Sequence, residues 1–162
     1  MNPARTLASR FRTQRTDRIR AGEEQVVSIY SLELSTTDVV ELRIESVASD
    51  IEQTMYVHAD GELSIDRGKP ASEHLLTVNI DELHEIRTAD TDRESIKVTF
   101  WNGWKLDTTD QAWTGNSGMV VEELKVMKPA SSRSRLWCSD GLGVAEFTNL
   151  VATVTAGTDT TT

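Results

Sequence analysis

A period of two in the hydrophobic pattern limits most strongly what this chain can fold into. The pattern is clearest over residues 39–47, where Val40, Leu42 and Ile44 alternate with charged side chains. Successive side chains of a β-strand point to opposite faces of the sheet, so this alternation predicts a half-buried strand. Similar short stretches recur between Gln25 and Thr155, separated by turn residues and not alternating with helices. This arrangement predicts an antiparallel, all-β protein.

The expected architecture is an antiparallel β-sandwich of the jelly-roll kind, or a small β-barrel, with about eight strands. The chain of 162 residues is long enough for one domain. We expect a basic arm or short helix in residues 1–22, a single β domain in residues 23–156, and a flexible threonine-rich tail in residues 157–162. The apolar runs are too short for a signal peptide or a membrane span, so neither is expected.

Two dipeptides, Asp60-Gly61 and Asn102-Gly103, predict tight hairpins, because both tolerate the positive φ angles of a type I′ turn. The second turn would place Trp101 opposite Trp104 on neighbouring strands, where the paired indoles would stabilise the hairpin. A stacking platform for a sugar or a base is the alternative interpretation of the same two tryptophans.

Charge is divided unevenly along the chain. Lysine and arginine total 17 and aspartate and glutamate total 26, for a formal net charge of −9. Residues 1–20 carry six arginines and one aspartate, a net +5, whereas the other 142 residues carry 11 basic and 25 acidic side chains, a net −14. A basic arm on an acidic body indicates two different kinds of contact. The arm can meet neighbouring copies, nucleic acid or an anionic membrane surface.

The arm also carries a short apolar stripe. Ala4, Leu7, Ala8 and Phe11 have the spacing of one face of a helix, and Pro3 suits its first turn. Such a segment is too short to fold alone and needs a surface to lie on. The candidate partner-binding residues are Arg5, Leu7, Arg10, Phe11, Arg12, Arg15, Arg18 and Arg20.

No catalytic, cofactor or metal site emerges from the sequence, and we expect a protein that is not an enzyme. His58, His74 and His84 do not have the spacing of a metal site. His58 is expected beside Leu63 in a hairpin, and His84 is expected at the surface. The only cysteine, Cys138, is expected to be a small buried residue.

The composition is typical of proteins from salt-adapted organisms, with 5 lysines, 12 arginines and 20 threonines on an acidic chain. In the arm Arg5–Arg20, the strand run Gln25–Thr155 and the tail Gly157–Thr162, the chain resembles the single-jelly-roll capsid proteins of icosahedral viruses. The resemblance implies a coat subunit of the virion that assembles with other copies and with other virion proteins. It implies no cofactor and no small-molecule substrate. A virus of a halophilic host would suit the composition.

Two alternative functions remain open at this point. A tail-tube or head–tail joining protein of a tailed virus would also be a small β-barrel with arms, and its acidic body would suit a lumen through which DNA slides. A carbohydrate-binding β-sandwich module would instead use Trp101 and Trp104 to stack on a sugar.

Overall fold

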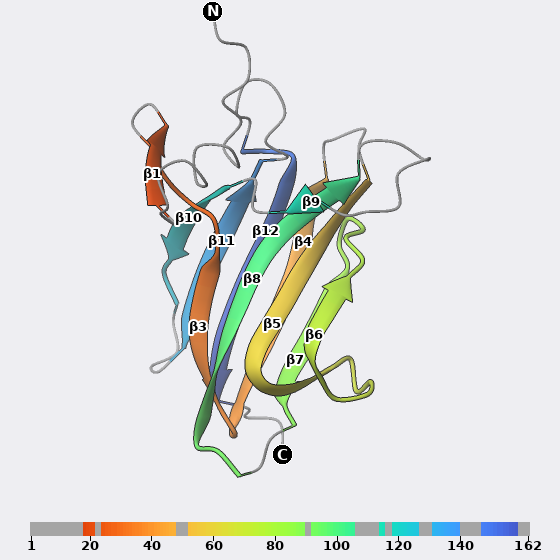
Figure 1. Ribbon diagram of the computed structural model, residues 1–162. Helices are drawn as coiled ribbons and strands as arrows, with labels where there is room; N and C mark the ends of the chain where they lie inside the picture. Colours follow the sequence, from red (N-terminus) through yellow and green to blue (C-terminus); the bar gives the residue numbers. More distant parts are fainter. Residues whose placement is uncertain are drawn as a thin grey trace, which may run out of the picture.

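The fold is all-β, as the sequence predicts. The computed structural model describes residues 18–21, 24–47, 52–89, 92–105, 114–115, 118–126, 131–139 and 147–158. Within these ranges the regular elements are β-strands without a helix, and the paired strands run antiparallel. Figure 1 shows the sheet curled into a half-barrel, an architecture consistent with the predicted sandwich or barrel.

The described ranges contain twelve strands, more than the eight expected. They are β1 (Arg18–Ala21), β2 (Glu24–Val27), β3 (Tyr30–Ser35), β4 (Asp38–Val47), β5 (Glu52–Ile65), β6 (Ala71–Leu76), β7 (Leu83–Thr88), β8 (Ser95–Lys105), β9 (Thr114–Gly115), β10 (Met119–Leu124), β11 (Ser132–Cys138) and β12 (Leu150–Thr158). Hydrogen bonding places them in the order β1-β2-β10-β11-β12-β4-β7-β5-β8-β3, with β6 paired to β5 and β9 to β8.

The long strand β5 produces the curl of the sheet. Its first part pairs with β8 as far as Ala59, and its last part pairs with β7 from Leu63 onward. The register of its pairing with β6 shifts between His58 and Leu63, as expected of a bulge, which bends a strand and increases its twist. One strand therefore belongs to both sides of the half-barrel.

The hairpin predicted at Asp60-Gly61 is wrong. Both residues lie inside β5, and neither is among the described residues with a positive φ. The Asp60 carboxylate instead accepts the Lys97 backbone N–H at 2.8 Å and an Arg93 guanidinium N–H at 3.2 Å. These contacts favour an extended backbone at Asp60, so the chain does not reverse direction there. The chain turns later, at Asp66 and Arg67, whose φ angles are 53° and 62°.

The hairpin predicted at Asn102-Gly103 is wrong for the same reason. Strand β8 continues through both residues and pairs with β5 as far as Lys105. The Asn102 side chain is buried, and its amide donates to the Ser139 carbonyl oxygen at 2.8 Å. Long-range pairing along β8 has overridden the local preference of Asn-Gly for a turn.

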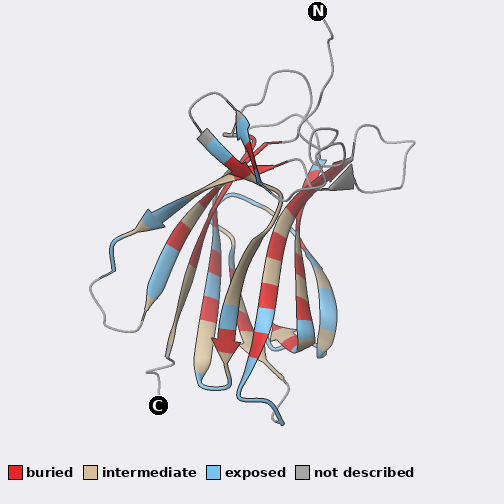
Figure 2. Ribbon diagram, turned by 60° about the vertical axis from the view of Figure 1, so that its left-hand side comes forward, coloured by how far each residue is buried: buried red, intermediate tan, exposed pale blue. Residues whose placement is uncertain are grey.

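The predicted alternation in β4 is confirmed. Val40, Leu42 and Ile44 are fully buried, whereas Glu41 and Arg43 are exposed. The same change between buried and exposed positions runs along the neighbouring strands in Figure 2. The core lies inside the curl and contains, as its largest fully buried side chains, Phe100, Leu34, Leu42, Ile44, Met55, Leu63, Ile86, Ile96, Met119, Leu136 and Leu150.

The chain between β2 and β3 passes through Ser28 and Ile29, because β2 pairs with β1 and β10 whereas β3 pairs with β8. The tail begins later than expected, because Gly157 and Thr158 still pair with β4.

Candidate functional site

The candidate functional site is a seam where the curled sheet does not close. Strand β3 is the last strand of the hydrogen-bonded order, and within the described ranges it pairs with β8 alone. Strand β10 pairs with β11 along its length but with β2 only through Met119 and Val27. Each of the two strands therefore has an edge without a described partner over most of its length.

A hollow of about 610 Å³ lies at this seam. It brings together residues of β1, β2 and β3, which follow one another in the sequence, with residues of β8 and β10. Its lining comprises Arg18, Gln25, Val27, Ile29, Tyr30, Ser31, Lys97, Val120, Val121 and Glu123. The Tyr30 hydroxyl donates to Ser134 Oγ at 3.3 Å, which links β3 to β11 across the interior.

The edge of β3 lacks the usual protection against pairing. Exposed edge strands are commonly blocked by lysine, proline or a bulge. Residues 30–35 contain neither lysine nor proline and pair with β8 in continuous register. At its end, the Ser35 N–H donates to the Asp38 carboxylate at 2.9 Å instead of to β8. Alternate residues of an antiparallel strand share one hydrogen-bonding direction, so the Glu33 N–H also points away from β8.

A small apolar cluster holds the β1–β2 hairpin beside the seam. Ile19 and Val26 are buried, and Val120 and Phe147 pack against them. This cluster is separate from the main core. The position of the hairpin therefore depends on a small number of apolar contacts.

Only the end of the predicted arm lies in the described ranges. Arg18 and Arg20 are exposed residues of β1, so this end of the predicted arm or short helix is an extended strand. Arg18 lines the hollow at the seam. The other candidates lie outside the described residues: Arg5, Leu7, Arg10, Phe11, Arg12 and Arg15.

The two tryptophans do not form the predicted clasp. Trp101 and Trp104 lie on the same strand, so they cannot face each other across a turn. Trp101 instead stacks on Tyr56 of β5, with ring centroids 5.3 Å apart and planes within 10°. Trp104 is buried, and its indole N–H has no partner among the described residues.

The stacked pair lines a second, smaller hollow of about 280 Å³. His58, Glu73 and Leu75 also line it, and Leu75 is 55% exposed. His58 faces Glu73 on β6 across the strands, not Leu63 as the predicted hairpin required. The hollow thus combines an aromatic surface with a carboxylate and an imidazole.

His84 lies in a buried polar cluster, so its predicted place at the surface is wrong. Its Nδ1 is 2.8 Å from Asp66 Oδ2, and its Nε2 is 2.9 Å from both Glu82 Oε1 and the Thr77 carbonyl oxygen. All three partners are acceptors, so both ring nitrogens donate and the imidazolium form fits the cluster. The contact between Asp66 and His84 could not be predicted from the sequence, because the two residues are 18 positions apart.

The contacts of the cluster shift the pKa values of its members. Burial alone lowers the pKa of His84, but the hydrogen bonds to Asp66, Thr77 and Glu82 outweigh it, and the pKa is raised. Burial alone raises the pKa of Asp66 and Glu82, but hydrogen bonds to their carboxylates outweigh it, and both pKa values are lowered. The charged forms of all three groups are therefore favoured.

A second polar network covers the outer face of β10 and β11. The Arg135 guanidinium donates to Glu45 at 2.8 Å and to Glu122 at 3.3 Å. Thr153 donates to the same Glu45 carboxylate at 2.7 Å, and the Trp137 indole donates to Glu122 at 3.1 Å. The network neutralises Arg135 and links four neighbouring strands, β10, β11, β12 and β4.

Cys138 is fully buried, as expected, and burial raises the pKa of its thiol to about 12. The described histidines, cysteine and acids include no group of three that could hold a metal ion. Within the same ranges, no helix has the length and apolar character needed to cross a membrane.

Comparisons with protein-family models, with curated proteins and with solved structures found no match to this chain.

Proposed function

We propose that this protein is a non-enzymatic structural subunit of a virion, a capsid protein that assembles with other copies of itself. The observation that carries the proposal is the open seam between β3 and β10. Two strand edges that have no partner among the described residues are suited to accept a strand from another chain, since each added strand satisfies donors and acceptors on both sides.

The charge pattern supports the same proposal. The arm of residues 1–20 carries a net +5 and ends in β1, which borders the seam through Arg18. The rest of the chain is strongly acidic, so the arm of one copy is attracted to the body of another. Such contacts enlarge an interface without enlarging the core, and a standard stable interface buries about 1,600 Å² in total.

Light scattering of the full chain from low to molar salt tests the proposal. We expect assemblies much larger than the 18.0 kDa monomer. A matched variant that begins at Asp17 removes most of the arm but keeps β1 intact. We expect this variant to be monomeric. A full-length monomer at every salt concentration would overturn self-assembly, and a discrete ring in place of a closed shell would favour the tail-tube or joining protein.

A single substitution tests the seam without shortening the chain. Glu33→Pro removes a backbone N–H that points away from β8, so it blocks the edge of β3 and leaves the β3–β8 hydrogen bonds in place. Glu33→Ala is the control, because it removes only the carboxylate that accepts from Ser95 at 3.3 Å. We expect assembly to be lost in the proline variant and kept in the alanine variant. Assembly by both variants, each with a native circular dichroism spectrum, would exclude the seam.

A second candidate function is carbohydrate binding, favoured by the hollow that Tyr56 and Trp101 line with Glu73 and His58. Aromatic faces beside polar groups are suited to stack on a sugar ring. The pair differs from the predicted Trp101–Trp104 platform, because Trp104 is buried. Screening of soluble oligosaccharides by tryptophan fluorescence, with Trp101→Ala as the matched variant, tests it. A monomeric protein with a saturable, Trp101-dependent signal would favour this function over assembly.

A further inference from the structure

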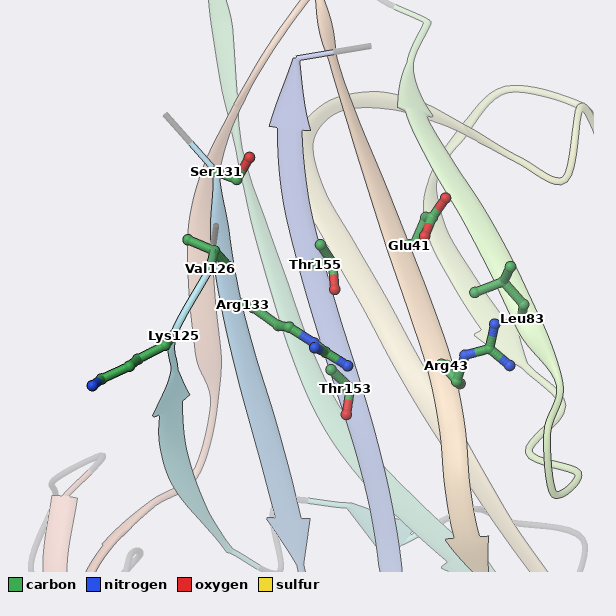
Figure 3. A pocket seen from close by; sticks show the side chains of 9 residues that line it. All are labelled: Glu41, Arg43, Leu83, Lys125, Val126, Ser131, Arg133, Thr153 and Thr155. Atoms are coloured by element: carbon green, nitrogen blue, oxygen red, sulfur yellow. The ribbon is translucent and has the colours of Figure 1, made fainter. Parts of the chain in front are cut away.

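A second surface feature, independent of the seam, is a shallow groove of about 430 Å³ on the outer face of the sheet. Figure 3 shows its nine lining side chains, which come from β4, β7, β11 and β12 and from residues next to β10 and β11. Three of them are cations: Arg43 on β4, Arg133 on β11, and Lys125 just after β10. With the single carboxylate of Glu41, the lining has three positive charges and one negative charge, a net +2 on a chain of net −9.

These cations are held near one another by the strand register. Arg133 lies opposite Thr155 and Arg43 lies opposite Thr153, so the two arginines flank the same strand, β12. The backbones of β11 and β4 are two strand spacings apart, about 10 Å. Figure 3 shows the Arg133 side chain reaching across β12 toward Thr153. Both guanidinium groups can therefore reach a ligand that lies over β12.

In the described part of the chain the three cations of the groove make no ion pair, although the charge of Arg133 helps to lower the pKa of Glu45. Arg135, the next outward residue after Arg133 on β11, makes ion pairs with Glu45 and Glu122. In the same described ranges, Arg43, Arg133 and Lys125 have no carboxylate within ion-pair distance, Glu41 included. Like charges gathered without a counter-ion repel one another, and a bound anion relieves that repulsion.

The remaining lining residues are suited to an oxyanion. The hydroxyl groups of Thr153 and Thr155 on β12 lie between the two arginines, and Ser131 lies at one end of the groove (Figure 3). All three can donate hydrogen bonds to phosphate oxygens. The planar guanidinium groups of Arg43 and Arg133 fit two oxygens of one phosphate at a time. Leu83 and Val126 are partly exposed at the rim, with 42% and 37% of their surface accessible.

We propose that this groove binds a ligand that carries two or more neighbouring phosphate groups. The separation of Arg43 from Arg133 across β12 requires more than one anionic group to engage both side chains. The hydroxyl groups between them supply the central contacts. Glu41 restricts the ligand to the part of the groove over Thr153 and the two arginines. Two sources share this chemistry: a free polyphosphate and the backbone of a nucleic acid.

Isothermal titration of the full chain with inorganic tripolyphosphate and with a short single-stranded oligonucleotide tests the proposal. We expect saturable binding of at least one probe at 0.15 M salt and weaker binding at 1 M, where the Debye length is about 3 Å. A preference for tripolyphosphate would indicate a free polyphosphate, and a preference for the oligonucleotide would indicate a nucleic acid backbone. No binding of either probe would overturn the proposal.

Matched charge variants locate the binding. Arg43→Gln with Arg133→Gln is expected to weaken binding at least about tenfold, because each substitution removes charge-assisted hydrogen bonds. Lys69→Gln removes an exposed cation from the β5–β6 turn and is expected to leave binding unchanged. Equal weakening by all variants would show general charge attraction and overturn the groove. If the double variant fails to fold, Lys125→Gln provides the same test with a smaller expected effect.

Discussion

The two sides of the curled sheet differ in how completely their strands are paired. On one side, β5 has partners on both edges, β8 and β7 along one and β6 along the other, and β8 lies between β5 and β3. On the other side, β10 has one full-length partner, and the β1–β2 hairpin rests on the small cluster of Ile19 and Val26. The difference shows that one polypeptide can concentrate its stability in the closed side, around β5 and β8, and hold the open side, around β10 and the β1–β2 hairpin, with fewer contacts.

The largest effect on stability is expected when an aromatic side chain is removed from the core of the closed side. Phe100 is fully buried and packs against Tyr30, with ring centroids 6.1 Å apart. We expect Phe100→Ala to reduce the free energy of unfolding by about 3–5 kcal/mol, because it leaves a cavity in the main core. Urea denaturation measures the change.

The corresponding substitution on the open side sharpens the comparison. Val26→Ala, in the small cluster, is expected to cost about 1–2 kcal/mol and to raise hydrogen exchange mainly in β1 and β2. If Val26→Ala destabilised the whole sheet as much as Phe100→Ala, the two sides would form one cooperative unit, and the distinction between them would be wrong.

An intermediate effect on stability is expected from the polar cluster around His84. His84→Ala leaves Asp66 and Glu82 without their shared cationic partner, and we expect a loss of about 1–3 kcal/mol. His58→Ala is the control, because His58 is half exposed and lies 3.9 Å from Glu73. A loss no larger than that of the control would show that the cluster contributes nothing to stability.

The pH dependence of the same cluster has a definite sign. The pKa of His84 is raised on folding, so its contribution is complete below about pH 6.5, the ordinary value, and is lost as the pH rises through the folded value. The pKa values of Asp66 and Glu82 are lowered, so their contributions are present above about pH 4.5 and are lost as the pH falls. The difference in stability between the wild type and His84→Ala is therefore expected to be largest near pH 5.5, measured by urea denaturation from pH 4 to 9.

The smallest effect on stability is expected from the ion pairs of Arg135 on β11, which lies between β10 and β12. Arg135→Gln removes two ion pairs from a partly exposed network, and we expect a loss of about 0.5–1 kcal/mol that shrinks in molar salt. Arg133→Gln, two residues away and without an ion pair in the described ranges, is expected to be neutral or slightly stabilising. Thermal unfolding of both variants separates them, and a larger loss in Arg133→Gln would contradict the assignment of an unneutralised groove.

Local pattern predicted the strand faces well and the turns badly. The alternation around Leu42 located β4 and its buried face, because the side-chain direction in a strand depends only on residue parity. The Asn102-Gly103 preference for positive φ is real but small, and the continuous ladder between β5 and β8 outweighs it. Asp60-Gly61 lies beyond the end of that ladder, and there the Asp60 carboxylate accepts hydrogen bonds from Lys97 and Arg93. The seam itself was not predicted, because the edges of β3 and β10 that lack a described partner depend on which strands pair.

The sequence by itself determined that this chain forms a sheet with one apolar face, because hydrophobic periodicity is a property of neighbouring residues and survives any rearrangement of strands. Only the tertiary structure decided where the sheet bends, which edges stay open, and which charges meet. Asp66, Glu82 and His84 lie together, whereas Arg43, Arg133 and Lys125 surround a groove without a counter-ion in the described ranges. The reason is physical: these juxtapositions follow from pairing registers between residues that are far apart in the chain, and no local preference encodes them.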